Sequence, residues 1–146
     1  MCRLISRFSI CLMIGVLLAS GVIATAVRGA DDAKGLQGNW LAVKTELAGE
    51  PVNWTVMLTI EDDKYTVLAN GKSDKGTCKV DASARPGKMT VTGGDGGPNA
   101  GKTFLAIYEL DGDMLRICYD LSGKKHPETF ATQKGTPLYL VTYKRK

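Results

Sequence analysis

Histidine is almost absent from this sequence: among 146 residues there is only His126. A metal site built on it would need cysteine or carboxylate ligands at close spacing, and none is found nearby. A Ser–His–Asp arrangement would have to recruit Asp120 and a distant serine, and the chain has no nucleophile-elbow pattern. Catalysis requires a positioned base and nucleophile. We therefore expect no catalytic residue, no metal ligand and no cofactor, and interpret the protein as a non-enzyme.

A charge excess of either sign is also lacking. The 19 lysines and arginines exceed the 15 aspartates and glutamates by four, and two of the arginines, Arg3 and Arg7, lie in a segment that we expect to be removed. The remaining excess is too small to attract nucleic acid in general. We expect no nucleic-acid partner, and interpret the basic cluster Lys144-Arg145-Lys146 as a solvated tail.

Only one long apolar run exists, Ile10 to Ile23, and it is short for a membrane span of ~20 residues. It follows Arg3 and Arg7 and precedes Ala24-Thr25-Ala26, the order typical of a secretory signal peptide. We predict that residues 1–26 are a signal peptide, with residue 30 as a later cleavage point, and that residues 31–146 form one exported domain, periplasmic or extracellular. The alternative is a retained N-terminal anchor; after cleavage no stable membrane span is expected.

What the chain does contain is a clear hairpin signal in Thr103–Asp120. Asp111 and Gly112 separate two apolar runs, and glycine accepts the positive φ that such turns require. In the second run Leu115, Ile117 and Tyr119 fall on one face and Met114, Arg116 and Asp120 on the other, which is the period of a strand.

The register of this hairpin stays open at the level of sequence. A two-residue turn pairs Tyr108 with Leu115, while a three-residue turn with a bulge pairs Ile107 with Ile117. A slip of one residue exchanges the faces of a strand, so the two registers predict different inward sets.

Further strands are expected at spacings of roughly 8–12 residues, as in a β-sandwich or an up-and-down barrel. The expected segments are Leu41–Leu47, Thr55–Ile60, Lys64–Leu68, Ser73–Asp81, Lys88–Thr92 and Leu138–Tyr143, with Glu128–Thr132 as an additional short strand. We predict an all-β, antiparallel up-and-down barrel of about eight strands. Such a barrel places the strands of Cys78 and Cys118 about three positions apart. A disulfide needs Cα atoms within ~7 Å, so free thiols are favoured over a bond.

Gly38-Asn39-Trp40 resembles the lipocalin signature. The resemblance implies that Trp40 plugs one end of an eight-stranded barrel against Lys144 or Arg145, and that Gly38 and Trp40 are structural, as Asp111 and Gly112 are in the hairpin. Nearly the whole mature chain resembles an uncharacterised, lipocalin-like domain family of exported proteins expanded in planctomycete bacteria. The matching segments are 36–40, 63–67, 76–81, 101–103, 107–113, 115–119, Pro127 with Phe130, and 144–145. The resemblance implies the fold and no known activity. The segment Pro51–Trp54 is shorter than the family's usual stretch.

Residues Gly96–Thr103 match the phosphate-binding loop pattern G-x-x-x-x-G-K-[ST]. That loop works at the start of a helix, and here an expected strand follows, so we expect no nucleotide partner.

Aromatic residues could line a ligand cavity or fill the barrel, since both occur in barrels of about eight strands. If the hairpin lines the interior, the ligand-binding residues are Phe104, Tyr108, Leu115, Ile117 and Tyr119. The leading hypothesis is an exported binding module for a small apolar ligand. The alternative is a module that binds an envelope protein and has a solidly packed barrel.

Overall fold

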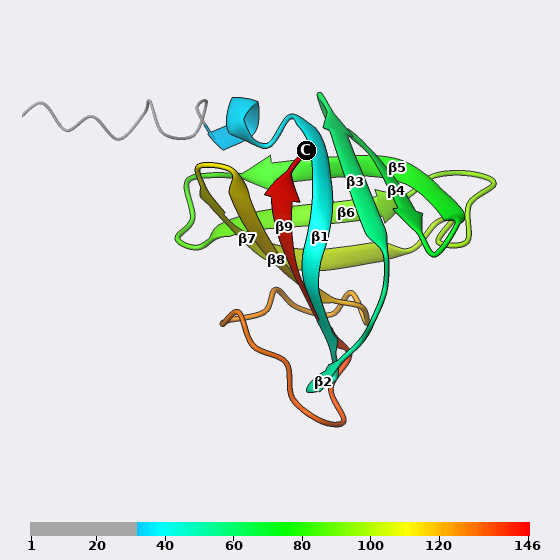
Figure 1. The fold of residues 1–146 in the computed structure, drawn as a ribbon, viewed down its shortest axis with the longest axis vertical. Coiled ribbons are helices and arrows are strands. Elements are labelled where there is room, and N and C mark those ends of the chain that lie inside the picture. Colours follow the sequence, from blue (N-terminus) through cyan, green and yellow to red (C-terminus); the bar gives the residue numbers. More distant parts are fainter. Residues whose placement is uncertain (1–31) are drawn as a thin grey trace, which may run out of the picture.

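The computed structural model describes residues 32–146, so the predicted signal peptide lies outside the described residues. The chain forms nine strands (Figure 1): β1 Gly38–Leu47, β2 Glu50–Pro51, β3 Val56–Glu61, β4 Lys64–Ala69, β5 Lys72–Asp81, β6 Gly87–Gly93, β7 Thr103–Asp111, β8 Met114–Asp120 and β9 Leu138–Arg145. The helical turn Asp32–Gly35 is the only helix in this part of the chain. No helix between residues 32 and 146 is long and apolar enough to cross a membrane.

The sheet closes on itself. From β3 to β9 each strand pairs antiparallel with the next strand in the chain, β1 pairs with β3, and β9 returns to pair with β1. The two-residue β2 pairs only with the end of β1. The prediction of an all-β, antiparallel up-and-down barrel of eight strands is confirmed. Closure gives every long strand two partners, which removes the exposed edges that an open sheet would have.

The central hairpin adopts neither predicted register. Asp111 pairs with Met114 and Tyr108 with Ile117, so that the turn residues are Gly112 and Asp113. Gly112 has the positive φ expected of it, 57°, whereas Asp111 ends β7. Compared with the predicted two-residue turn, the partner of Tyr108 moves by two positions, from Leu115 to Ile117. A shift by an even number of residues keeps the same side chains on the inward face, so the inward face is the one predicted for that turn.

The segment Glu128–Thr132 is not a strand, and that prediction is wrong. Because β8, β9 and β1 already pair with one another, no strand edge is left for this segment to join. It belongs to the β8–β9 connection, which lies against the outer wall: the Arg116 guanidinium lies 4.5 Å from the Phe130 ring centre. The connection also covers Cys118, whose Sγ faces the Ala131 carbonyl at 4.0 Å.

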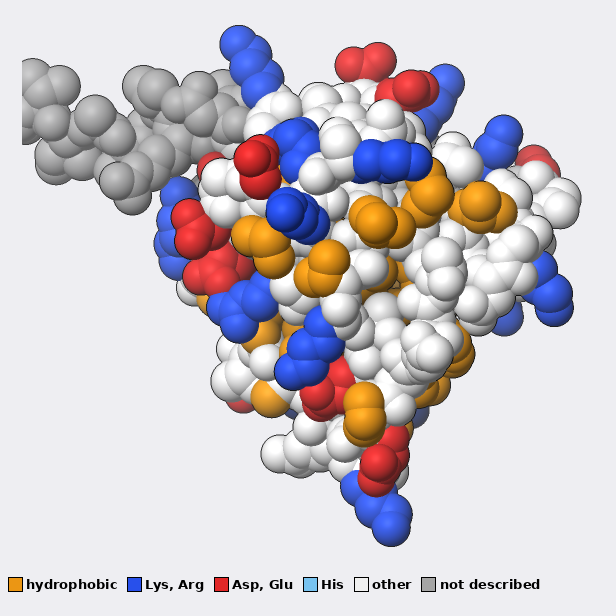
Figure 2. Space-filling view, in the orientation of Figure 1, with side chains coloured by type: hydrophobic (Ala, Val, Ile, Leu, Met, Phe, Trp, Pro, Cys, Tyr) orange, Lys and Arg blue, Asp and Glu red, His pale blue; other side chains and the backbone are white. Residues whose placement is uncertain are grey.

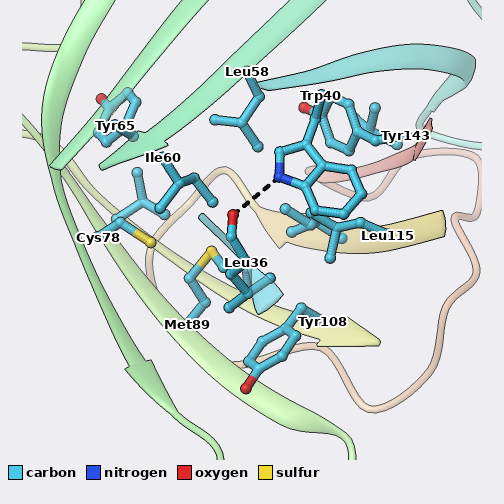
Figure 3. Packing of buried hydrophobic residues seen from close by; sticks show 14 of the residues in the cluster. Leu36, Trp40, Leu58, Ile60, Tyr65, Cys78, Met89, Tyr108, Leu115 and Tyr143 are labelled. Carbon is cyan, nitrogen blue, oxygen red and sulfur yellow. Dashed lines mark hydrogen bonds between the residues drawn. The ribbon is translucent and has the colours of Figure 1, made fainter. Parts of the chain in front are cut away.

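One end of the barrel is closed by packing (Figure 3). Trp40 is fully buried there, and its indole Nε1 donates to the Leu36 carbonyl at 3.0 Å. The guanidinium of Arg145 lies 4.2 Å from the Trp40 ring centre, and donates to the carbonyls of Gln37 at 2.9 Å and Gly35 at 2.6 Å. Arg145 is therefore the basic partner that the lipocalin resemblance implied, and the interpretation of residues 144–146 as a solvated tail is wrong for Arg145.

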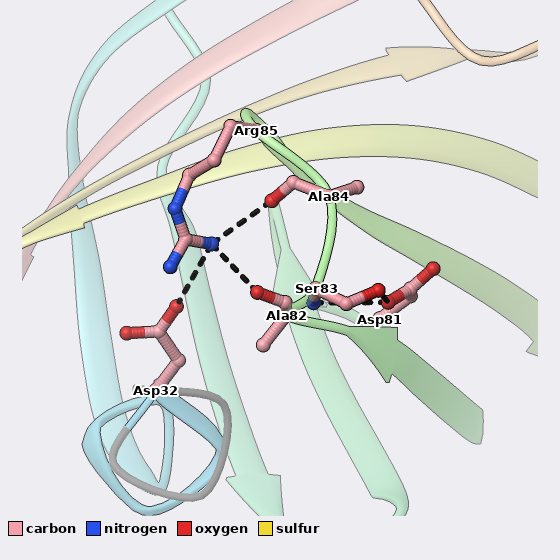
Figure 4. A network of polar contacts seen from close by, with 6 residues as sticks. All are labelled: Asp32, Asp81, Ala82, Ser83, Ala84 and Arg85. Carbon is pink, nitrogen blue, oxygen red and sulfur yellow. Dashed lines mark hydrogen bonds and ion pairs between the residues drawn. The ribbon is translucent and has the colours of Figure 1, made fainter. Parts of the chain in front are cut away.

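The turn between β5 and β6 is tied to the same end (Figure 4). Arg85 Nη1 donates to the carbonyls of Ala82 at 2.6 Å and Ala84 at 2.9 Å, and lies 3.9 Å from the carboxylate of Asp32 in the helical turn. Hydrogen bonds from Ser83 lower the pKa of the Asp81 carboxyl. The ion pair is exposed and adds little stability. The ion pair places the β5–β6 turn beside the helical turn at the closed end, and the hydrogen bonds order the β5–β6 turn itself.

Candidate functional site

The other half of the barrel encloses a cavity of about 340 Å³. Its mouth is bordered by Trp54, by Asn70 of the β4–β5 turn, by Leu121 and by residues 94–102 between β6 and β7, which we call the mouth loop. Aliphatic side chains of β3, β4 and β6 form much of its wall: Val56, Leu58, Ile60, Val67, Ala69 and Val91. Aromatic side chains complete the wall: Trp54, Tyr65, Phe104, Tyr119, Tyr139 and Tyr143.

The size of the inward side chains explains why only this half is hollow. Along β4 the inward residues Tyr65, Val67 and Ala69 become smaller toward the mouth. The closed half instead holds Trp40, Tyr108 and other large side chains. An eight-stranded barrel is wide enough either to be filled by side chains or to hold one small ligand, and this barrel does one in each half.

The predicted site residues divide between the two halves. Phe104 and Tyr119 line the cavity. Tyr108, Leu115 and Ile117 point inward but are almost fully buried in the packed half and do not line it. The hairpin runs along the barrel with its turn at the closed end, where the Arg145 amide donates to the Asp113 carbonyl at 2.8 Å. Side chains near the turn therefore join the packed core, and those far from it reach the cavity.

The sequence prediction missed two aromatic residues at the mouth. The ring centres of Trp54 and Tyr139 lie 5.4 Å apart, and those of Tyr139 and Tyr119 lie 6.0 Å apart. Trp54 is 39% exposed although it is a large apolar side chain. Tyr139 could have been found from the period-two pattern of Tyr139, Val141 and Tyr143 in the last strand. The position of Trp54 carries no such signal, because it lies between strands.

A polar group interrupts the apolar wall at Asp74, a third residue that the sequence prediction missed. Its side chain is buried, and its Oδ2 accepts hydrogen bonds from the Tyr65 hydroxyl at 2.9 Å and from Asn99 Nδ2 at 2.8 Å. Its Oδ1 is buried and has no hydrogen-bond partner among residues 32–146. A Cβ at position 97 would lie 2.6 Å from Oδ1, so Gly97 lets the mouth loop approach this carboxylate.

Burial keeps the phenol and thiol groups of the cavity wall in their neutral forms at neutral pH by raising their pKa. Burial raises the pKa of the Tyr65 phenol, with the hydrogen bond to Asp74 adding to the effect, and burial also raises the pKa of Tyr119. Burial raises the pKa of Tyr139 to about 12 and that of the Cys78 thiol to about 11. These phenols are hydrogen-bond donors at neutral pH rather than charges.

The remaining candidates lie away from this cavity. His126 Nδ1 donates to the Ala106 carbonyl at 2.9 Å and does not line the cavity. Within residues 32–146, Cys78 and Cys118 are free thiols, as expected; Cys78 faces the interior, whereas Cys118 lies beneath the β8–β9 connection. The segment that matches the phosphate-binding loop pattern leads directly into strand β7. A strand in place of a helix was the reason for expecting no nucleotide partner.

Comparisons of this chain with protein-family models, with curated proteins and with solved structures found no match. The cavity is therefore the feature of the molecule from which a function can be inferred.

Proposed function

We propose that this protein is a non-enzymatic binding module that holds a small apolar ligand in the open half of its barrel. The observation that carries the proposal is the cavity of about 340 Å³ with mainly aliphatic and aromatic walls. Small-molecule sites in proteins are commonly concave, largely apolar and ~300–1,000 Å³ in volume, with a few polar groups that orient the ligand. Burial of apolar ligand surface supplies the driving force, at ~25 cal/mol per Å² before the costs of association.

The test uses Nile red, an uncharged apolar dye, and two variants of adjacent residues in β4. Val67 faces the cavity, and Leu68 faces solvent with 43% of its surface exposed. Val67→Trp fills the cavity, so we expect saturable binding by the native protein to weaken at least tenfold. Leu68→Trp adds the same side chain on the outer wall and should leave the affinity unchanged. Absence of saturable binding by the native protein, or equal weakening by both variants, would refute the proposal.

The proposal includes export, as a periplasmic or extracellular protein. It is supported by the order of basic residues, apolar run and Ala24-Thr25-Ala26 at the start of the chain. The Trp40–Arg145 contact also supports the resemblance to lipocalin-like exported domains. Mass analysis of protein extracted from its own cell envelope should find a chain that lacks residues 1–26; retention of Met1 would contradict export by cleavage.

A second candidate function is a protein–protein module, which an apolar row on the outer wall favours. Leu41 of β1 pairs with Met57 of β3, and Met57 pairs with Leu68 of β4. Leu41 and Leu68 are exposed, and Val43 is 57% exposed. Figure 2 shows hydrophobic side chains gathered on this face. Contiguous exposed apolar surface is typical of interaction sites. This alternative assumed a solidly packed barrel, and the hollow half argues against that assumption. The protein–protein module becomes the favoured function only if the native protein binds no Nile red.

A further inference from the structure

We infer that the ligand of this cavity is an amphipathic amine whose protonated nitrogen pairs with Asp74. The inference rests on the proposed function, because it assigns a ligand class to the same cavity. It is drawn from two independent features, the unsatisfied carboxylate oxygen of Asp74 and the aromatic side chains at the mouth.

The first feature is the incomplete hydrogen bonding of Asp74. Only 9% of this residue is exposed, and both hydrogen bonds to its carboxylate, from Tyr65 and Asn99, end on Oδ2. Oδ1 has no partner in the described part of the chain, and it lies beside Gly97, where an added Cβ would be 2.6 Å away, so a ligand reaches it by displacing this part of the mouth loop. A buried carboxylate oxygen without a donor is unfavourable, and the surrounding wall supplies no further donor to it. A ligand ammonium supplies both the missing donor and the opposite charge, which makes the stronger, charge-assisted type of hydrogen bond.

The second feature is the aromatic mouth. Trp54, Tyr139 and Tyr119 form a series of neighbouring rings, and all three line the cavity that Asp74 lines. An ammonium group is attracted to the faces of such rings, most strongly to tryptophan. The rings also accept the apolar body of the ligand, so a cationic amine with an aromatic or aliphatic body matches the whole wall.

Lys72 would favour the opposite charge, and its position makes it the weaker of the two charged groups. It is the only basic residue among the described residues that line the cavity, and it is exposed. A lysine ammonium in contact with water is screened, whereas a buried carboxylate interacts with a ligand charge at a lower effective dielectric constant. The cavity should therefore prefer a cation to an anion.

The mouth loop fixes the carboxylate in place. Asn99 of this loop donates to Oδ2, and the loop is itself held by bonds from the amides of Gly93 to Lys102 O at 2.9 Å and of Gly101 to Gly93 O at 3.1 Å. Asp74 thus has a set orientation before a ligand arrives, and the cost that binding must offset is the movement of Gly97 away from Oδ1.

The test compares three probes that share one apolar body: 1-naphthylmethylamine, 1-naphthylmethanol and 1-naphthoate, a cation, a neutral molecule and an anion at neutral pH. Their affinities are measured by isothermal titration calorimetry with the native protein. The cation should bind at least about tenfold more tightly than the alcohol, as expected for a hydrogen bond between charged groups. The anion should bind most weakly.

Two variants then locate the preference. Asp74→Asn should reduce the difference between amine and alcohol to less than about twofold. Asp95→Asn removes the same charge from the mouth loop at an exposed residue that does not line the cavity, and should preserve the difference. A difference that survives Asp74→Asn would overturn the assignment, whatever Asp95→Asn does.

The outcomes separate the two proposals. Equal binding of amine and alcohol by the native protein, or tightest binding of the naphthoate, overturns the role of Asp74 and leaves the apolar cavity as proposed. Failure of all three probes and of Nile red overturns the cavity as a binding site. If Asp74→Asn does not fold, the three-probe comparison with the native protein decides alone: a tenfold preference for the amine supports the inference, and its absence overturns it.

Discussion

Replacing each of the two tryptophans within residues 32–146 by alanine should separate stability from binding. Trp40 is fully buried at the closed end, while Trp54 is 39% exposed at the mouth of the cavity. Trp40→Ala should therefore destabilise the barrel severely. Trp54→Ala should leave its stability nearly unchanged and weaken the binding of Nile red.

The expected size of the Trp40 effect follows from three contacts. Truncating a buried tryptophan costs ~3–5 kcal/mol. The Leu36 carbonyl loses the indole donor at 3.0 Å, which adds ~1 kcal/mol. The Arg145 guanidinium loses the ring at 4.2 Å, a further ~0.5–1 kcal/mol. We expect a total loss of about 4.5–7 kcal/mol, a large fraction of the ~5–15 kcal/mol typical of a domain. For the exposed Trp54 the expected change is within about 0.5 kcal/mol.

The assay is urea unfolding followed by far-ultraviolet circular dichroism, which reads the sheet in the same way in each variant. With a slope of ~1–3 kcal/mol per molar urea, Trp40→Ala should lower the midpoint by about 1.5 M or more, or leave the chain unfolded without urea. Trp40→Phe keeps most of the ring and loses the indole donor, so it should lose ~1–2 kcal/mol and remain folded. Near-native stability of Trp40→Ala, or equal losses for Trp40→Ala and Trp54→Ala, would refute this account of the closed end.

Arg145→Met should destabilise the barrel by ~2–3 kcal/mol in urea unfolding, because two charge-assisted bonds to backbone carbonyls are lost; Lys144→Met, an exposed neighbour, is the control, and an equal loss for both would contradict the role of Arg145. Burial raises the pKa of the thiols of Cys78 and Cys118 to about 11. Both should therefore react slowly with Ellman's reagent in the folded protein and completely in urea; an unfolded chain of residues 31–146 without free thiol would show a disulfide instead. The raised pKa of Tyr139, about 12, favours the neutral phenol in the folded state. Its stabilising contribution is complete below the unfolded pKa of ~10 and is lost as the pH rises toward 12. The urea midpoint should therefore fall over that pH range. A constant midpoint would argue against burial of the neutral Tyr139 phenol.

Much of the fold could be read from local patterns. The segments with period-two alternation became strands within a few residues of their predicted bounds, because alternation places apolar side chains on one face of a strand whatever its partner is. Glu128–Thr132 shows the limit of that reasoning. A short run around Phe130 has a strand-like composition, but the closed barrel offers it no edge, and Phe130 packs beneath Arg116 on the outer wall instead.

The candidate site was less predictable. Of the five residues expected to bind a ligand, Phe104 and Tyr119 reach the cavity, and the other three lie in the packed half. Alternation indicates which face of a strand points inward, and it carries no information on depth along the barrel axis. Asp74 was missed for a different reason: it shares the strand face of Cys78 and Val80, but a carboxylate is not expected to be buried on an inward face.

The sequence by itself determined the all-β class and the hairpin order of the strands, because turn residues and side-chain alternation act between neighbours in the chain. The place of Trp40 at one end was implied only by the resemblance to lipocalins. Only the tertiary structure decided that the barrel is packed in one half and hollow in the other, and that Asp74, Trp54 and Tyr139 border the same cavity. These properties depend on how closure aligns side chains from strands far apart in the sequence. The volume left inside the barrel depends on the inward side chains of all the strands together, so it cannot be predicted from the pattern of any one segment.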